Sequence, residues 1–456
     1  MKYNNPMLQL PHPIKDFMQQ FRDNHFEIYT VGGTVRGLLM HASVTDWDFT
    51  TNAKPEEIRT LFPHSFYNNT FGTVGIPIEM DGTQEVFEVT TYRKESGYSN
   101  ARHPDEVTWS DRVTDDLARR DFTINAIAYD GEHMIDPYNG QEDIKKKIIR
   151  AVGDPDIRFT EDALRLMRAV RQASQLGFEI EEKTLDSIRK NAEKIKQISG
   201  ERIRDEFFKL LLSPHPAEGI LLLRATGILK YILPEVEQNF DVDQKSPERH
   251  HIYDVGTHLV ESLRNCPSHD VITRLATLIH DIGKAETYRK DPETDIITFY
   301  NHEVVGEKMA EVIADRFKLS KEQKKKLVLL VRHHQFTVSE EQSDKAIRRF
   351  IRQIGVENID DMLALRTGDR LGSGSKETSW RTELFKKRVV DVQNVPFTVH
   401  DLKITGHDVM KVLGIEPGPK IGDIMDRIFE EVDDEKLPNE REALLSRLTE
   451  IKNTNQ

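Results

Sequence analysis

Two short motifs near the amino terminus combine residue types that bind phosphate and metal ions. Gly32 and Gly33 end a predicted strand, and a helix is expected to begin at about Thr34. Adjacent glycines let the backbone approach a phosphate closely, and the first turn of the helix would point its amide groups at the same place. Asp46 and Asp48 follow on the next predicted strand, where alternate residues share a face. Paired carboxylates hold metal ions, so the two motifs predict metal-assisted phosphoryl or nucleotidyl transfer.

A third carboxylate and a pair of arginines extend this candidate site. Glu88 lies on another predicted strand and could complete a metal site or orient its ligands. The string RRDFTINA begins with Arg119 and Arg120, which we expect at the start of a helix. The helix dipole opposes cations there, and this cost is easier to understand if a triphosphate lies opposite them. Taken alone, Asp46 and Asp48 would equally fit a solvated strand end, and the arginines a surface charge pair.

The elements that must position these residues alternate between strands and helices. Between residues 27 and 136, β-rich runs and helical stretches follow one another, the runs at 27–31, 46–50, 64–68, 73–78 and 85–92 and the helices at 33–41 and 55–62. The segment 93–115 is rich in turn residues and is expected to form a long loop. After residue 154, apolar residues recur at helical spacing. The sequence therefore predicts an α+β fold that becomes mainly α-helical.

The length of the chain predicts several domains. A chain of 456 residues is too long for one core and should form roughly three or four domains. Changes of pattern near residues 149–155, 238–248 and 393–399 place their boundaries. The predicted domains are residues 1–150, 151–240, 241–392 and 393–456.

Composition limits where the protein works and what it binds. No apolar run is long enough to cross a membrane, and the first residues lack the apolar core of a signal peptide, so we expect a cytoplasmic protein that does not bind membranes. The single cysteine, Cys266, fits a reducing compartment. The net charge of −13 is unusual for a protein that binds nucleic acid. Residues 141–215, however, carry 16 basic against 14 acidic side chains, which weakens this objection.

Five motifs occur in the order found in class II tRNA nucleotidyltransferases. They are GG-x-VR at 32–36, D-x-D at 46–48, RRDFTINA at 119–126, ED-x-x-R at 161–165 and ER-x-R-x-E-x-x-K at 201–209. The chain therefore resembles this family of CCA-adding enzymes, which is grouped with bacterial poly(A) polymerases in the polymerase-β-like nucleotidyltransferase superfamily. The resemblance implies an N-terminal nucleotidyltransferase head with a mixed sheet and helices. Mainly α-helical neck, HD and C-terminal domains would follow it.

The resemblance also implies roles for individual residues of the head. Asp46 and Asp48, with Glu88 as a third carboxylate, would hold two Mg²⁺ ions that activate the RNA 3′-hydroxyl and stabilise the pyrophosphate leaving group. Residues expected to contact the nucleotide are Gly32, Gly33, Arg36, Arg119, Arg120, Asp121, Asn125, Asp162, Arg165 and Arg168. Within this set, Asp162 and Arg165 would share a helix face and read the Watson–Crick edge of CTP or ATP. Without the other motifs, that pair would be interpreted as an intrahelical salt bridge.

Two features bear on how closely the chain follows its relatives. Family members usually carry Asp after the arginine of the first motif, and this chain has Gly37. A glycine there weakens the helix by about 1 kcal/mol and removes a carboxylate that could support the metal ligands. The segment 93–115 has Arg93, Arg102, Pro104 and Asp105 in familiar places. Its full length favours complete CCA addition over the partial CC addition of relatives with a shortened loop.

A second constellation of metal-ligating side chains follows the head. It resembles the HD superfamily of metal-dependent phosphohydrolases, whose ligand pattern is matched by His258, His280, Asp281 and Asp369. Lys284 matches the lysine that follows the HD pair, and His302 lies in the same stretch. Imidazole and carboxylate ligands on several helices are how a helical bundle builds a metal centre. His333 and His334 are weaker candidates for ligands, because a histidine pair in a basic helix is more often at the surface.

The resemblance implies a divalent metal of unknown identity in this HD site, with phosphatase and cyclic-phosphodiesterase activity on RNA 3′ ends. The segments 402–408 and 414–422 resemble strings that close class II nucleotidyltransferases, where C-terminal helices hold tRNA. By itself the second of them predicts a Gly/Pro turn that presents a helix N-terminus, which is a possible phosphate site.

The leading hypothesis is a tRNA nucleotidyltransferase that adds CCA from CTP and ATP and carries an HD phosphohydrolase. A poly(A) polymerase, a CC- or A-adding enzyme, and an HD phosphohydrolase whose head mainly binds RNA remain alternatives. A non-catalytic RNA-binding protein would leave Asp46 and Asp48 without a task. The sequence predicts neither the oligomeric state nor the identity of the HD metal.

Overall fold

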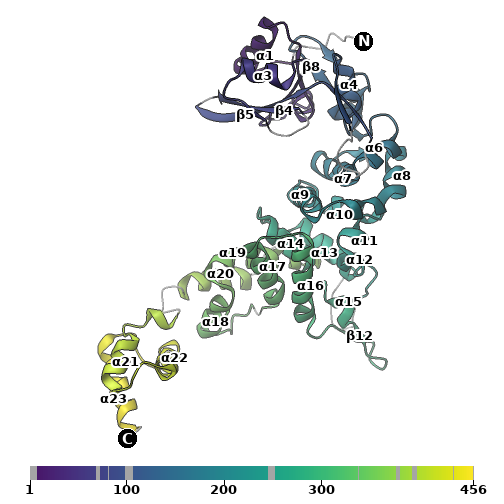
Figure 1. Ribbon diagram of the computed structural model, residues 1–456. Coiled ribbons are helices and arrows are strands. Elements are labelled where there is room, and N and C mark those ends of the chain that lie inside the picture. Colours follow the sequence, from purple (N-terminus) through teal and green to yellow (C-terminus); the bar gives the residue numbers. More distant parts are fainter. Residues whose placement is uncertain are drawn as a thin grey trace. The chain divides into compact units, whose positions relative to one another are not determined.

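The computed structural model describes residues 8–67, 72–80, 82–97, 106–244, 252–336, 338–375, 380–392, 398–434 and 436–454. The chain forms two units. The N-terminal unit contains Met1–Val242 and Val312–Ser320, and the C-terminal unit contains Asp243–Glu311 and Lys321–Gln456. A mixed sheet lies in the first unit and helices predominate elsewhere, so the predicted α+β class is confirmed (Figure 1).

The N-terminal unit is built on a seven-stranded sheet. Its strands, in spatial order, are β3 (Phe66–Tyr67), β4 (Thr73–Met80), β5 (Thr83–Thr91), β2 (Asp48–Thr51), β1 (Ile28–Val31), β8 (Ala128–Tyr129) and β9 (Met134–Ile135). Neighbouring strands run antiparallel except β2 and β5, which are parallel. This parallel pairing places Asp48 directly beside Glu88. The predicted strands are thus confirmed, although Asp46 precedes β2 rather than lying in it.

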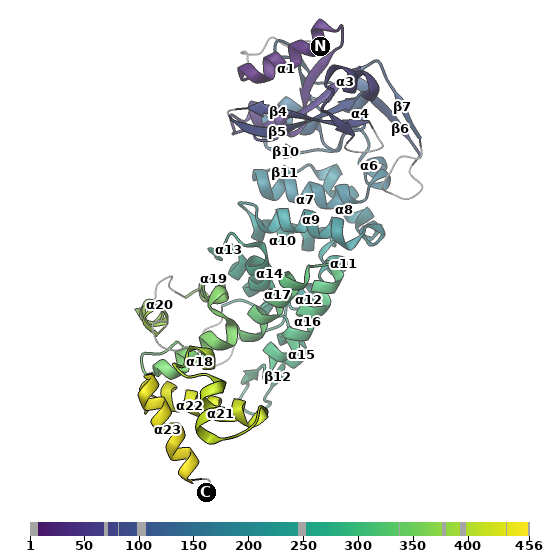
Figure 2. The ribbon, with the colours of Figure 1, turned by 60° about the vertical axis from the view of Figure 1, so that its left-hand side comes forward.

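Helices cover the sheet and build the rest of this unit. They are α1 (His12–Asp23), α2 (Gly33–Leu39), α3 (Pro55–Leu61), α4 (Val113–Ala118), α5 (Gly140–Lys146), α6 (Pro155–Glu161), α7 (Leu164–Leu176), α8 (Glu182–Asn191), α9 (Gly200–Leu211), α10 (Pro216–Ala225), α11 (Leu229–Ile232) and α12 (Pro234–Glu237). Phe17 of α1 packs on the sheet against Phe49 and Phe87, with ring centroids 4.9 and 5.0 Å away. Beyond the sheet, α7 packs against α9 and α10 (Figure 2).

The segment 93–115 differs from its prediction. We expected a long loop, but its described ends form an antiparallel pair of strands, β6 (Arg93–Ser96) and β7 (Glu106–Trp109), and α4 begins at Val113. Charged residues dominate β6, so it lacks the apolar alternation by which a strand is recognised. The prediction of complete CCA addition depended on four residues. Arg93 begins β6, whereas Arg102, Pro104 and Asp105 lie outside the described residues.

The C-terminal unit is mainly helical. It contains β12 (Arg289–Lys290), β13 (Ile297–Thr298), α13 (Val255–Arg264), α14 (Val271–Ile279), α15 (Lys284–Thr287), most of α16 (His302–Arg316), α17 (Lys321–His333), α18 (Asp344–Ile354), α19 (Ile359–Gly372), α20 (Trp380–Val392), α21 (Gly406–Leu413), α22 (Pro419–Asp433) and α23 (Arg441–Thr454). The last three helices share a core of their own that includes Val409, Ile428 and Leu444. No helix among the described residues is long and apolar enough to cross a membrane.

Two glycines bring α13 and α19 into close contact. A Cβ atom on Gly368 would lie 2.6 Å from the carbonyl oxygen of Ser262, and one on Gly372 would lie 2.3 Å from the Ser262 hydroxyl oxygen. These separations are shorter than any van der Waals contact, so larger residues would push the helices apart. Since α13 carries His258 and α19 carries Asp369, the same contact brings two predicted metal ligands together.

Candidate functional site

The three predicted carboxylates lie on or next to two inner strands of the head sheet. Asp48 and Glu88 are neighbours on the parallel strands β2 and β5, and Asp46 precedes Asp48 by two residues. Burial raises the pKa of Asp48, Arg120 lowers it, and the charges of Glu88 and Asp46 raise it further. Carboxylates that repel one another in a buried site are stabilised by a divalent cation. Asp48 is half-buried, whereas Asp46 and Glu88 are exposed, and among the described residues of the head no three ligand atoms lie within 4.8 Å of one another. The Mg²⁺ site therefore stays a prediction.

The hydroxyl group of Thr34 fixes the D-x-D motif to the glycine motif. It donates a hydrogen bond to the carbonyl oxygen of Asp46 at 2.9 Å and accepts one from the backbone N–H of Asp48 at 3.0 Å. Thr34 is itself buried in the first turn of α2. Sequence reasoning did not assign it to the site, because a threonine inside a glycine motif carries no sign of which distant backbone it will contact.

At Gly32 the backbone passes close to two other predicted site residues. Its φ of +66° is in the left-handed region, which favours glycine. A Cβ atom there would lie 3.0 Å from Nη1 of Arg120 and 3.4 Å from Oδ2 of Asp48. The glycine motif thus lies beside both the guanidinium group of Arg120 and the carboxylate of Asp48. Gly33 follows as the first residue of α2.

Arg119 and Arg120 lie at the end of a helix, so the prediction of a helix start was wrong. Arg119 caps the carboxyl end of α4, and Thr123–Asn125 forms only a short 3₁₀ turn. Asp116 of α4 is fully buried and binds both arginines, with its oxygens 2.6 Å from Arg119 Nη2 and 3.2 Å from Arg120 Nη2. The helix dipole favours cations at this end. The two arginines therefore carry no unfavourable interaction with the helix dipole, and this reason for expecting a triphosphate beside them is wrong. Both residues nevertheless line the head cavity.

Asp121 is the centre of a buried polar network. Its Oδ2 accepts two hydrogen bonds from Arg168, at 2.9 and 2.6 Å, and its Oδ1 accepts one from Asn125 at 2.9 Å. The Asn125 side-chain oxygen in turn accepts a hydrogen bond from Arg36. Burial would raise the pKa of Asp121, but Arg168 and Asn125 lower it below its usual value. The network joins α2, the 3₁₀ turn and α7, and contains four predicted nucleotide-contacting residues.

Asp162 and Arg165 do not share a helix as predicted. Asp162 caps the end of α6 and Arg165 lies in the first turn of α7, because the chain breaks its helix at residues 162–163. Each side chain has another partner. Asp162 Oδ2 lies 3.0 Å from Arg202 Nη2, and Arg165 Nη1 lies 2.6 Å from Glu161 Oε2. The simpler interpretation as an intrahelical salt bridge between the two is therefore also wrong.

The N-terminal unit contains a cavity of about 390 Å³, which many of the predicted site residues line. Eight predicted residues line it, namely Asp48, Glu88, Arg119, Arg120, Asp121, Asp162, Arg165 and Arg168. Arg93 and Arg202 line it as well and had not been assigned to the site. The guanidinium groups suit recognition of a triphosphate. Nε of Arg120 and Nη1 of Arg202 are buried without a hydrogen-bond partner, so the cavity has donors to offer a ligand.

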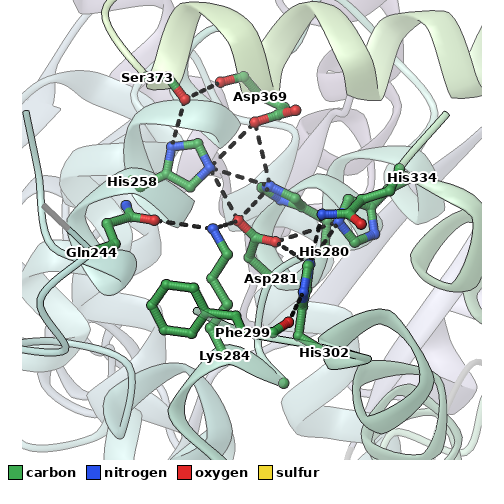
Figure 3. A network of polar contacts seen from close by, with 12 residues as sticks. Gln244, His258, His280, Asp281, Lys284, Phe299, His302, His334, Asp369 and Ser373 are labelled. Carbon is green, nitrogen blue, oxygen red and sulfur yellow. Dashed lines mark hydrogen bonds and ion pairs between the residues drawn. The ribbon is translucent and has the colours of Figure 1, made fainter. Parts of the chain in front are cut away.

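The C-terminal unit contains a cluster of six buried or half-buried metal-ligating side chains (Figure 3). Two groups each have ligand atoms within 4.8 Å of one another, His258 with His280 and Asp369, and Asp281 with His302 and His334. Asp281 lies between the groups. Its Oδ2 is 3.4 Å from His258 Nε2 and 3.3 Å from His280 Nε2, and its Oδ1 is 3.0 Å from His302 Nε2 and 3.3 Å from His334 Nε2.

Three of these imidazole rings are oriented by the backbone three residues earlier. Nδ1 of His280 donates to the Thr277 carbonyl at 2.8 Å, as His302 does to Phe299 at 2.8 Å and His334 to Val331 at 2.7 Å. A ring that donates from Nδ1 keeps the lone pair of Nε2 for a metal ion. The donor set, its orientation and its burial therefore fit a divalent metal, and Asp281 could contribute one oxygen to each of two ions.

The expected surface position of the His333–His334 pair is wrong for His334. We expected both at a surface, yet His334 is buried and belongs to the ligand cluster. His333 ends α17 and is half-buried, and burial lowers its pKa. The chain leaves the helix after His333, so the next side chain turns inward. An apolar helix face running into a His-His pair was the only signal in the sequence.

The charges of this cluster are strongly coupled. Burial lowers the pKa of His280, but Asp281 and Asp369 raise it to about 10. Burial likewise opposes ionisation of Asp281, yet Lys284 and His280 hold its pKa well below the usual value. The Lys284 ammonium lies 2.6 Å from Asp281 Oδ2. These charges favour a protonated imidazole at His280 and an ionised carboxylate at Asp281.

Comparison with known families matches three parts of the chain. Residues 28–150 match the poly(A) polymerase head domain, and residues 177–240 match a model described as "Probable RNA and SrmB- binding site of polymerase A". Residues 291–448 match tRNA nucleotidyltransferase domain 2. The first match contains the carboxylates and glycines described above.

Full-length relatives decide the family. A CCA-adding enzyme of Levilactobacillus brevis is 33% identical over 454 residues, which covers 97% of this chain and 100% of that protein. The chain belongs to the tRNA nucleotidyltransferase and poly(A) polymerase family. An A-adding tRNA nucleotidyltransferase of Deinococcus radiodurans is 34% identical over 413 residues, covering 88% of this chain and 90% of that protein. The match to the Lactobacillus helveticus CCA-adding enzyme, at 49% identity over 213 residues, spans 46% of this chain and about half (52%) of that relative.

A solved structure agrees with this family assignment. The CCA-adding enzyme of Bacillus stearothermophilus in complex with CTP aligns with a TM-score of 0.74 and 26% identity, over 98% of this chain and 99% of that one. The resemblance drawn from the five motifs is thus confirmed for the family.

Proposed function

We propose that this protein adds the 3′-terminal CCA to tRNA, using CTP and ATP and no nucleic-acid template. The observation that carries the proposal is the head cavity, where Asp48 and Glu88 lie opposite arginines and beside Asp162 and Arg165. Its support from relatives is the CCA-adding enzyme of Levilactobacillus brevis, which aligns along its entire length.

The reaction joins the tRNA 3′-oxygen to the α-phosphorus of a nucleoside triphosphate. The new P–O bond forms as the bond to the β-phosphate oxygen breaks, pyrophosphate leaves, and the hydroxyl proton passes to solvent. Two Mg²⁺ ions, when bound, would lower the pKa of the 3′-hydroxyl and stabilise the charge on pyrophosphate. Asp46, Asp48 and Glu88 hold these ions in the proposal. Thr34 keeps the first two carboxylates in position.

The remaining residues position the nucleotide. The backbone at Gly32 and the guanidinium of Arg120 lie beside Asp48, where the phosphates must be to react. Asp162 offers an acceptor and Arg165 offers donors to the base, which suits both cytosine and adenine if the two side chains reorient. The network of Asp121 and Arg168 keeps this end of α7 fixed to the head.

An extension assay with each nucleotide omitted in turn tests this proposal. Purified protein with Mg²⁺ should add CCA to a tRNA that lacks it and then stop. Unlimited addition of AMP would instead favour the poly(A) polymerase alternative. Addition that stops after CC, or that occurs only on tRNA already ending in CC, would identify a CC- or A-adding enzyme.

We infer a second activity, metal-dependent phosphohydrolysis, from the six-residue cluster of the C-terminal unit. The observation that favours it is Asp281, whose two oxygens face two sets of histidines. Water would add to a phosphate ester at phosphorus, the P–O bond to the nucleoside would break, and that oxygen would take a proton. A bound divalent ion would supply an ionised water at neutral pH. Lys284 fixes Asp281 through their ion pair.

Metal content and hydrolysis together test this second activity. The protein, loaded in turn with Mg²⁺, Mn²⁺, Co²⁺ or Ni²⁺, should hydrolyse 2′,3′-cyclic AMP, and Asp281→Ala should lose both bound metal and hydrolysis. Retained hydrolysis in Asp281→Ala would remove the cluster from consideration as the active site.

The domain assignment follows from these roles. We propose a catalytic head at residues 1–150, a nucleotide-recognition and neck domain at 151–240, an HD domain at 241–392 and a tRNA-binding segment at 393–456. Turn residues before α22 and the exposed Lys420 support RNA contact by the last segment.

A further inference from the structure

The six candidate metal ligands of the C-terminal unit line one part of a cavity of about 420 Å³. The other residues that line this cavity are not candidate ligands. Two of these other residues could contact a ligand: Tyr300 is an exposed aromatic residue, and Arg366 carries a positive charge. Tyr300 lies between β13 and α16, two residues before His302, and is 77% exposed although it borders the cavity. Arg366 lies on α19, three residues before Asp369.

Tyr300 is held in place by its neighbours in the chain. Phe299 is buried, packs against Tyr288 with ring centroids 5.9 Å apart, and accepts the hydrogen bond from His302 Nδ1. The backbone on both sides of Tyr300 is therefore fixed, at Phe299 by packing and at His302 by its place among the six candidate ligands. Its phenol ring is left as an exposed aromatic surface at the cavity edge.

Arg366 is a cation with hydrogen-bonding capacity to spare. Its Nη1 lies 3.4 Å from Asp369 Oδ2, and its guanidinium lies 5.6 Å from the centre of the Phe336 ring. Its Nε is buried with no hydrogen-bond partner. Lys284, which also lines the cavity, is matched by Asp281 at 2.6 Å and by the Gln244 side-chain oxygen at 3.0 Å. An anion entering the cavity would therefore meet in Arg366 a guanidinium group whose hydrogen-bonding capacity its protein partners leave partly unused.

We propose that Tyr300 and Arg366 form a subsite for nucleoside phosphate esters, with the phosphate on Arg366 beside the metal ligands and the base stacked on Tyr300. The inference rests on the hydrolase activity proposed above and adds the part of the substrate that the pocket selects. Any base can stack on an aromatic ring, so the subsite distinguishes nucleosides from other phosphate esters and not one base from another. Free nucleotides and RNA 3′ ends share this chemistry.

Substrate selectivity in the full-length, metal-loaded protein tests the subsite. The substrates are adenosine 2′-phosphate, an RNA oligonucleotide ending in a 3′-phosphate, and glycerol 2-phosphate, which has no ring. For Tyr300→Ala we expect the kcat/KM for either nucleoside ester, divided by that for glycerol phosphate, to fall about tenfold, within the range of base–aromatic stacking. Tyr300→Phe should keep the wild-type ratio because it keeps the ring. Trp380→Ala removes an aromatic residue that is 62% exposed elsewhere in this unit, and should change nothing.

Arg366→Gln tests the phosphate half of the subsite. Because all three esters share the phosphate, KM should rise about tenfold for each, while their relative selectivity stays that of the wild type. Bound metal, measured by elemental analysis, should stay at the wild-type amount. Loss of metal instead would show that Arg366 acts through Asp369, and would overturn its role in the subsite.

The outcomes separate this inference from the proposed hydrolase. Hydrolysis of all three esters with an unchanged ratio in Tyr300→Ala would overturn the subsite alone. Absence of hydrolysis by the wild-type protein with every metal ion tested would overturn the hydrolase and the subsite together. Which nucleoside ester is the better substrate would distinguish a free nucleotide from an RNA end.

Discussion

Arg202 on α9 holds Asp162, with 3.0 Å between its Nη2 and Asp162 Oδ2. Asp162 is the carboxylate expected to read the base, and it lies at the α6–α7 junction, where no regular helix fixes its direction. The orientation of this acceptor therefore depends on a residue 40 positions away in the chain. Arg202 also lines the cavity, and its Nη1 is buried without a hydrogen-bond partner, so we expect Arg202 to act as a positioning residue for the proposed nucleotide site.

Arg202→Met should weaken nucleotide selection. Removing a hydrogen bond to a charged group costs about 1.5 to 3 kcal/mol, so we expect kcat/KM for CTP and ATP to fall at least tenfold. Arg189→Met is a suitable control because its ion pair with Asp186 is exposed. Single-nucleotide incorporation kinetics measure the effect. Equal kinetics in the two variants would show that Arg202 has no part in orienting Asp162.

Thr34→Val should damage catalysis more than folding. Valine has nearly the same shape but leaves the Asp46 carbonyl and the Asp48 N–H without their partner. Two lost hydrogen bonds of about 1 kcal/mol each predict a fall in kcat of roughly tenfold or more. Thr34→Ser retains the hydroxyl group and should stay close to the wild type. If the serine variant were as slow as the valine variant, the methyl group and not the hydroxyl would be the important part.

Gly37 is explained by packing rather than by the missing carboxylate. A Cβ atom at this position would lie 3.0 Å from Cγ2 of Val44, so the Asp usual in the family cannot fit without a shift. We expect Gly37→Asp to lower the free energy of unfolding by about 1 to 3 kcal/mol, which is typical of overpacking. Val44→Ala in the same chain should recover most of this loss. Additive effects in the double variant would contradict the contact.

The pair of Asp121 and Arg168 should make stability depend on pH. Burial raises the pKa of Asp121, but Arg168 lowers it below its value in the unfolded chain. The ionised carboxylate therefore stabilises the fold above the unfolded pKa of about 3.9, and this contribution is lost as pH falls toward the folded pKa. Asp121→Asn should cost about 1 to 3 kcal/mol at pH 7, with a difference from wild type that shrinks below about pH 4.

Calorimetric melting between about pH 7 and pH 2 measures this difference, because the predicted change lies below the unfolded pKa of about 3.9. Asp186→Asn removes an exposed carboxylate from the same unit and serves as the control. A gap between Asp121→Asn and wild type that stays constant from pH 7 down to about pH 2 would show that the carboxylate charge is not the stabilising feature.

Periodicity and motif order predicted the parts of the fold that depend on neighbouring residues. Asp48 and Glu88 were expected on strands, and the pairing of β2 with β5 places them side by side. The helix limits near Arg119 and Asp162 were not predicted, because buried Asp116 and the break at residues 162–163 override local helix preference. Short-range pattern records which face a residue occupies, but not which distant residue will pack against it.

Among the six candidate metal ligands too, the sequence predicted those that are neighbours in a motif but not the one that tertiary packing brings in. His280 and Asp281 are adjacent in the sequence and were predicted as ligands, and their ligand atoms do lie together. His334 was expected at a surface because it follows a basic helix, yet it faces Asp281 at 3.3 Å. What decides its position is the end of α17 at His333, which depends on tertiary packing.

The central claim is that nucleotidyl transfer occurs in the head cavity and does not need the six candidate metal ligands of the C-terminal unit. Two variants, each measured in two assays, test this claim. Asp48→Ala should abolish addition of CMP and AMP to tRNA lacking CCA, and should leave hydrolysis of 2′,3′-cyclic AMP at the wild-type rate. Asp281→Ala should do the reverse. Loss of both activities in either variant, or extension that survives in Asp48→Ala, would contradict the account.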